Sequence, residues 1–129
     1  MKDLNTIVFT ILNKNSKMRV LENGILHTVF LKESILEVED VKEMKRGYES
    51  LPDPKPNKAI QEFEAGVSMS PKCRIYAAEH SPDLLGVAYI INGLPQRLLI
   101  HFYVKMWKRK KPVKVFQAFD EALGWLNTI

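Results

Sequence analysis

Cysteine is almost absent from this chain, and the common catalytic motifs are absent altogether. The 129 residues include one cysteine, Cys73, which excludes an internal disulfide and any site built from several cysteine ligands. A single thiol is typical of a reducing compartment, so we expect a cytoplasmic protein. No GxGxxG, phosphate-loop or GxSxG motif is present. We therefore expect a protein that is not an enzyme and holds no cofactor.

The three histidines also lack a pattern that could bind a metal. They are far apart and have neither HxxxH nor HxH spacing, so we expect no metal site. Glu62 and Glu64 would share one strand face, and no partner acid or base can be identified for them in the sequence. A pocket that placed His101 near Glu62 or Cys73 would instead indicate an enzyme.

Long hydrophobic runs are missing as well. The longest early run, Ile7–Leu12, is too short for the core of a signal peptide, and no segment could span a bilayer. With 129 residues, of which 46% are hydrophobic and 26% charged, the chain has the size and composition of an ordinary globular domain. We expect residues 1–129 to form one domain.

The net charge of +4 has a local origin. Six of the 19 basic residues lie between positions 105 and 114, which leaves 13 basic against 15 acidic residues elsewhere. We therefore do not expect nucleic-acid binding. Two interpretations of the basic cluster stay open, a solvated helix C-terminus and a peripheral contact with an anionic membrane surface. The residues that could contact an anion are Arg97, Lys105, Lys108, Arg109, Lys110 and Lys111.

The first third of the chain has the pattern of antiparallel strands. Residues 6–12 are rich in β-branched and aromatic side chains and predict a strand. Asn23 and Gly24 lie between apolar segments at 18–22 and 25–31, and this pair is favoured in a type I′ hairpin, where both residues have positive φ.

The middle third predicts two helices and a strand. Ser34 to Glu37 has capping-box spacing, and apolar residues then recur every three or four positions, which predicts a helix over 37–51. Residues 58–64 predict a strand. Ser70 followed by proline predicts a helix N-cap and a helix that extends to about His80.

The last third predicts strand, helix, strand and helix, over residues 84–91, 94–108, 111–116 and 119–126. Two apolar strands separated by one helix form a crossover unit with parallel strands. We therefore expect a single-domain α/β protein with a mixed sheet of four to six strands. It would have an N-terminal antiparallel hairpin, a parallel β-α-β core, and helices mainly on one face.

The same region carries a family resemblance. Its sequence resembles that of uncharacterised bacterial proteins of the STAS-like class. The resemblance is carried by Gly86–Pro95, the helix to Trp107, Pro112–Phe116 and Asp120–Leu126. That class is related in fold to the sulphate-transporter and anti-sigma-factor-antagonist domain. The resemblance implies regulation through protein contact. In the antagonists, a serine or threonine at the start of the helix after the third core strand is phosphorylated.

That phosphorylated position corresponds here to the segment containing Ser68 and Ser70, which are the candidate phosphorylation sites that the resemblance implies. Ser70 also has the sequence context of a simple helix cap. Cys73, within the first turn of that helix, could have a lowered pKa, although a buried and inert thiol is the better prediction.

The expected helix over 94–108 has an unusually broad apolar surface. One interpretation is a central helix packed on all sides, and the other is a contact surface or pocket wall. We expect a non-enzymatic binding or regulatory module that acts through protein contact, as a homodimer. The alternative is a carrier or sensor of a small lipid-like hydrophobic ligand. The residues expected to form the interface or pocket are Leu98, Phe102, Tyr103, Met106 and Trp107.

Overall fold

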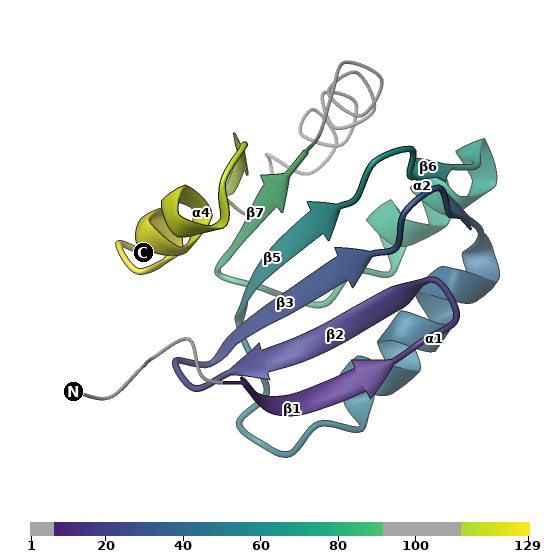
Figure 1. The fold of residues 1–129 in the computed structure, drawn as a ribbon. Coiled ribbons are helices and arrows are strands. Elements are labelled where there is room, and N and C mark those ends of the chain that lie inside the picture. Colours follow the sequence, from purple (N-terminus) through teal and green to yellow (C-terminus); the bar gives the residue numbers. More distant parts are fainter. Residues whose placement is uncertain (1–6, 92–111) are drawn as a thin grey trace.

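The computed structural model describes residues 7–91 and 112–129, and its main feature is one six-stranded sheet (Figure 1). The strands follow the order β1-β2-β3-β5-β7-β8. The first three pair antiparallel, and the pairs β3-β5, β5-β7 and β7-β8 are parallel. This is the mixed sheet that the sequence predicts.

The antiparallel part comprises β1 (Ile7–Leu12), β2 (Ser16–Leu21) and β3 (Ile25–Phe30). The hairpin between β2 and β3 forms where the Asn-Gly pair predicts it, but the predicted type I′ turn is wrong. Only Gly24 has a positive φ, of 82°, and its N–H donates to the Leu21 carbonyl oxygen at 2.9 Å. The loop is one residue longer than a type I′ turn allows, so a single left-handed glycine suffices.

The parallel part comprises β5 (Lys58–Phe63), β7 (Gly86–Ile90) and β8 (Val113–Phe116). These strands confirm the three that the sequence predicts in this half. β7 is buried along its whole length, as expected for a central strand that is covered on both faces. Two further short strands, β4 (Ile35–Leu36) and β6 (Ser68–Met69), pair in parallel outside the main sheet.

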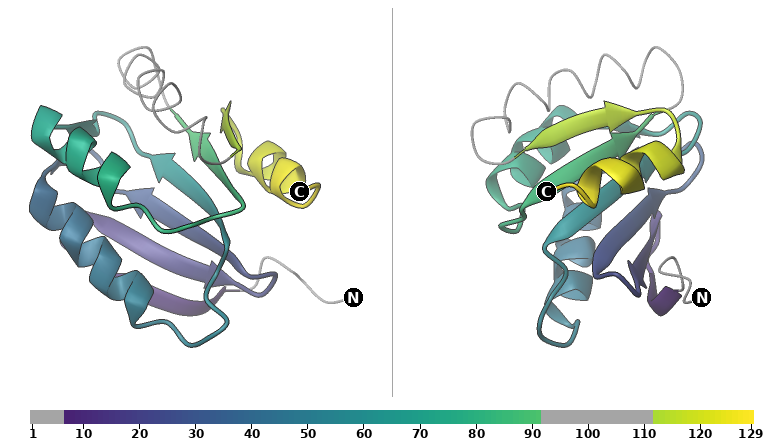
Figure 2. Two further views of the ribbon diagram at one scale, coloured as in Figure 1. Left: turned by 180° about the vertical axis from the view of Figure 1, so that it is seen from behind. Right: turned by 90° about the vertical axis from the view of Figure 1, so that its left-hand side faces the viewer.

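Helices cover both faces of the sheet (Figures 1 and 2). α1 (Val38–Glu49) and α2 (Pro71–Glu79) lie side by side on one face, and α4 (Phe119–Leu126) lies on the other. Each of α1 and α2 connects two parallel neighbours, β3 to β5 and β5 to β7, which is the expected crossover arrangement. The helix predicted over 94–108 lies outside the described residues.

The caps of α1 and α2 differ in how well the sequence predicts them. The predicted Ser34 cap is wrong, because residues 35 and 36 pair with β6 and Glu37 is the N-cap of α1. Asp40 then closes the first turn by accepting the Glu37 backbone N–H at 2.8 Å. The Ser70 cap is confirmed, since its hydroxyl oxygen accepts the Cys73 backbone N–H at 3.1 Å.

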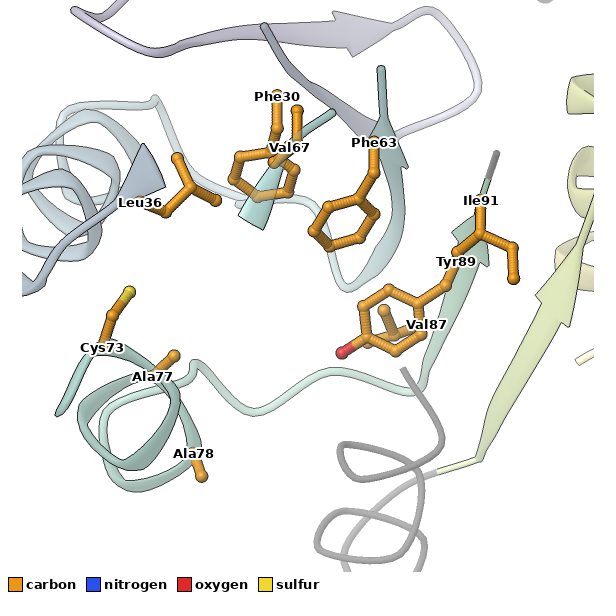
Figure 3. Close-up of a cluster of buried hydrophobic side chains, with 10 residues drawn as sticks. All are labelled: Phe30, Leu36, Phe63, Val67, Cys73, Ala77, Ala78, Val87, Tyr89 and Ile91. Carbon is orange, nitrogen blue, oxygen red and sulfur yellow. The ribbon is translucent and has the colours of Figure 1, made fainter. Parts of the chain in front are cut away.

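Alternating strand residues supply a separate core to each face. On the α4 face, aliphatic residues such as Ile60 and Ala88 pack against Ala122 and Leu126. The face toward α1 and α2 is more aromatic: the rings of Phe30 and Phe63 stack with centroids 4.7 Å apart. This second cluster is shown in Figure 3, and its members are Phe30, Leu36, Phe63, Val67, Cys73, Ala77, Ala78, Val87, Tyr89 and Ile91.

Candidate ligand pocket

A pocket of about 400 Å³ lies between the sheet and the helices α1 and α2. Its floor comes from the inward-facing residues of β2, β3, β5 and β7, and its walls come from the two helices and the residues that follow α2. This volume falls within the range of small-molecule sites in proteins.

Small side chains leave this space open. Ala77 on α2 and Ala59 on β5 both face the pocket, where larger residues would fill the gap between helix and sheet. On α1, the predicted apolar face does point toward the sheet, but no residue of the helix is fully buried. Val41, Met44 and Tyr48 line the pocket, which explains why these apolar side chains stay partly exposed.

The pocket floor carries one polar row within an apolar surface. Thr28 on β3 is in register with Gln61 on β5, and Gln61 is in register with Tyr89 on β7. All three line the pocket. Because strands in register present neighbouring side chains on the same face, the three residues form a continuous polar row across the floor. We call Thr28, Gln61 and Tyr89 the polar row.

Charged side chains lie at the α1 and α2 walls of the pocket. Asp40, Lys45 and Glu49 come from α1, and Glu79 comes from α2. Asp40 is already engaged, because its carboxylate accepts hydrogen bonds from the Glu37 N–H and, at 2.9 Å, from the Asn15 side-chain amide. The walls therefore carry more negative than positive charge, and the charges lie away from the floor strands.

The Cys73 thiol is buried and chemically quiet. Its exposed fraction is 0%, and burial raises its pKa to about 12, with further contributions from the negative charges of Asp40 and Glu37. The prediction of a buried cysteine is confirmed, and a protonated thiol agrees with the predicted inertness. The dipole at the start of α2 does not produce a thiolate, because desolvation disfavours the charged form more strongly.

On the opposite face, the structure supplies the partner that the sequence did not reveal for Glu62. The His27 Nε2 lies 3.0 Å from the Glu62 Oε1, and the His27 ring lies 4.9 Å from the Phe119 ring. Burial lowers the pKa of His27, although the hydrogen bond and charge of Glu62 act in the opposite direction. His27 is therefore uncharged at neutral pH, and its Nε2–H donates to the carboxylate.

Glu64 is engaged differently, since its carboxylate accepts the Lys32 backbone N–H at 2.9 Å. His27 on β3 is in register with Ile60 on β5. Glu62 lies two positions further along β5 and on the same face, so His27 and Glu62 are diagonal neighbours. Residues 27 and 62 could not be linked from the sequence without knowing that β3 and β5 are neighbours. Within residues 7–91 and 112–129, no group of three or more metal-ligating side chains is found.

Two candidate phosphorylation sites can be located. Ser68 is exposed and lies in β6, whereas Ser70 is half-buried and caps α2.

The interface or pocket residues predicted at 98–107 and the anion contacts predicted at 97 and 105–111 lie outside the described residues. None of the helices in the described parts of the chain is long and apolar enough to cross a membrane.

Sequence reasoning missed the pocket, although a signal for its floor was present. β3 and β5 place Leu26, Thr28 and Phe30, and Ala59, Gln61 and Phe63, on the same face. In each strand, the middle residue of these three is polar and its two neighbours on the same face are apolar. Such a polar residue at matching positions of two adjacent strands indicates a polar site on a buried surface.

Comparison with solved structures supports the fold. The chain is similar to an uncharacterised protein of the DUF3478 family from Shewanella loihica PV-4, whose crystal structure has a SpoIIAA-like fold. The sequence identity is 18%, the alignment covers 98% of each chain, and the TM-score is 0.58. The protein therefore has the STAS-like fold that its sequence predicts.

Comparison with curated proteins found no significant match. A family profile matches residues 19–129, which span all described elements except β1 and the start of β2. The chain therefore belongs to the family described as a domain of unknown function, DUF7793.

Proposed function

We propose that this protein is a non-enzymatic binding module that holds a small hydrophobic ligand in the pocket between α1, α2 and the sheet. The observation that carries the proposal is the pocket itself, with its volume of about 400 Å³ and its largely apolar lining. An apolar ligand would gain dispersion contacts with side chains that now face open space.

The states of the buried titratable groups also favour binding over catalysis. Cys73 packs in the same core as a protonated thiol, and a thiol is a poor nucleophile in that form. The His27–Glu62 pair lies on the opposite face of the sheet, among residues that pack against α4. We also propose a cytoplasmic location, which is supported by the single cysteine of the chain.

The pocket is tested with N-phenyl-1-naphthylamine, an uncharged apolar fluorophore that brightens when it leaves water. We expect saturable binding by the wild-type protein. Ala77→Leu should weaken binding at least tenfold, because the added methyl groups enter the pocket. Ala65→Leu is the matched control, since Ala65 is exposed and does not line the pocket. Absence of saturable binding, or equal affinity in both variants, would overturn the proposal.

A second candidate function, contact between two copies of the chain, has its own observation. β1 is the first strand of the sheet order, and four of its apolar residues are well exposed: Ile7 (45%), Val8 (50%), Phe9 (47%) and Leu12 (74%). An exposed apolar edge strand is a ready surface for pairing with another chain. Such contact would agree with a regulatory role and with the homodimer that the sequence predicts.

Sedimentation velocity of the double variant Val8→Lys/Leu12→Lys tests this second function. We expect a dimeric wild type and a monomeric variant, because charge on an edge strand opposes pairing. Ile75→Lys, which changes an exposed apolar residue of α2, serves as the control. A wild-type protein that sediments as a monomer would exclude the homodimer. A dimer unaffected by the β1 variant would move the interface elsewhere, and Trp107→Ala would then test the predicted helix.

A further inference from the structure

We infer, on the basis of the proposed pocket function, that the ligand is an uncharged amphiphile whose hydrogen-bonding group binds Thr28 and Gln61 of the polar row. An apolar ligand alone would leave these groups in contact with hydrocarbon, which is unfavourable for polar groups removed from water. The ligand class therefore follows from the floor of the pocket rather than from its size.

The polar row is enclosed by apolar residues on both sides. Phe30 and Phe63 form the next inward-facing row toward one end of the strands, and Leu26, Ala59 and Val87 form the row toward the other end. The ring of Phe63 is stacked on that of Phe30, and its centroid lies 6.1 Å from that of the Tyr89 ring. A ligand seated on the floor would thus have one polar contact region between two apolar ones.

Thr28 and Gln61 are the two members of the polar row that carry the inference. Both residues line the pocket: Gln61 is half-buried, whereas Thr28 is only 1% exposed and presents little surface to the pocket. In the parts of the chain that the structure describes, neither the Thr28 hydroxyl nor the Gln61 side-chain amide hydrogen-bonds to another residue. Figure 3 shows the Tyr89 ring reaching from β7 toward the side of the cluster where Ala77 and Ala78 lie.

The chemistry of these groups selects an uncharged partner. A primary amide and a hydroxyl each offer both a donor and an acceptor, which suits an alcohol, amide or ester group in the ligand. Among the described lining residues, the charged ones are Asp40, Glu49 and Glu79 against Lys45, and this excess of negative charge repels an anion. A cationic group on the floor would lack an adjacent carboxylate, because the inward-facing floor positions of β3 and β5 are uncharged.

Displacement of bound N-phenyl-1-naphthylamine by four eight-carbon compounds tests the inference. Octan-1-ol, octanoate, octylammonium and 1-chlorooctane share a chain and differ in their end group. We expect octan-1-ol to bind wild type at least tenfold more tightly than the other three. Gln61→Leu and Thr28→Val, which retain size and remove hydrogen bonds, should each reduce octan-1-ol affinity several-fold and leave 1-chlorooctane affinity unchanged or improved.

Gln117→Leu is the matched control, because Gln117 is exposed and lies outside the pocket. If the fluorophore binds but the four compounds compete equally, or octanoate or octylammonium competes best, the inference is overturned while the proposed pocket function stands. If octan-1-ol and 1-chlorooctane lose affinity together in Gln61→Leu, the polar row does not bind the hydroxyl group of the ligand, and the inference fails too. If neither the fluorophore nor any compound binds, both proposals fail.

Discussion

At the scale of single residues, His27 shows how burial and pairing compete. Its Nε2 lies 3.0 Å from a Glu62 carboxylate oxygen, which favours the charged imidazolium, but desolvation by the surrounding core disfavours that form more strongly. Arg19, on the neighbouring strand β2 and in register with His27, adds further repulsion of positive charge. The net result is a pKa below the ordinary value of 6.5.

This lowered pKa predicts a loss of stability in mild acid. The unfolded chain takes up a proton on His27 near pH 6.5, whereas the folded protein takes it up only at a lower pH, so the free energy of unfolding should fall as the pH drops below 6.5. For one proton, the slope cannot exceed about 1.4 kcal/mol per pH unit. Urea unfolding at pH 7.5 and 5.5 measures the effect, and His27→Gln should reduce it. An equal pH dependence in both proteins would contradict the assignment.

Ser70 gives a second prediction for a single residue. Its hydroxyl oxygen accepts the Cys73 N–H, so Ser70→Ala should lower the free energy of unfolding by about 1 kcal/mol, the typical value of an N-cap. Ser70→Asp should retain most of that stability. Ser68→Ala should change it by less than about 0.5 kcal/mol, because Ser68 is an exposed residue. Chemical denaturation of the three variants provides the measurement, and equal stability of Ser70→Ala and Ser68→Ala would refute the cap.

At the scale of elements, α4 is attached to the sheet by a contact between residues that are 68 and 71 positions apart in the sequence. The Lys58 ammonium group, at the start of β5, donates to the backbone oxygens of Leu126 at 2.9 Å and Ile129 at 2.6 Å. A cation at a helix C-terminus also interacts favourably with the helix dipole. This contact adds to the packing of Ala122 and Leu126 against the sheet.

Removing this contact should loosen α4 selectively. We expect Lys58→Met to lower the free energy of unfolding by about 1–2 kcal/mol and to speed hydrogen exchange at the α4 amides more than at those of α1. Lys72→Met provides the comparison, because Lys72 is exposed on α2. Uniform changes in exchange over all helices would show that Lys58 does not act locally.

At the scale of the whole molecule, the central strands join the two cores. Side chains of β3, β5 and β7 alternate between the α4 face and the face covered by α1 and α2. Because the same strands contribute to both cores, separating them disrupts the packing of both. That residues 1–129 form one domain stays a prediction from the sequence.

Such coupling predicts one cooperative unfolding transition. In urea, the reactivity of the Cys73 thiol reports on the α2 side, and far-UV circular dichroism reports on the whole fold. Both curves should have the same midpoint in the wild-type protein, because the thiol is buried until the shared strands separate. Reactivity that appears at a lower urea concentration would show that α2 detaches independently.

Local sequence patterns determined much of this protein. The position of the hairpin at Asn23-Gly24, the Ser70 cap and the parallel arrangement of the last strands all follow from neighbouring residues, because turns, caps and strand patterns depend on chemistry within a few positions. Even there, the N-cap of α1 is Glu37 and not the predicted Ser34, because β4 pairs with β6 just before the helix.

Only the tertiary structure decided which distant residues meet. It paired His27 with Glu62 and aligned Thr28, Gln61 and Tyr89 into one polar row, since both depend on strand order and register. It also left the pocket open beneath α1. A cavity depends on how far apart helices and sheet settle once all side chains are packed together, and that distance is a property of the complete fold rather than of any segment.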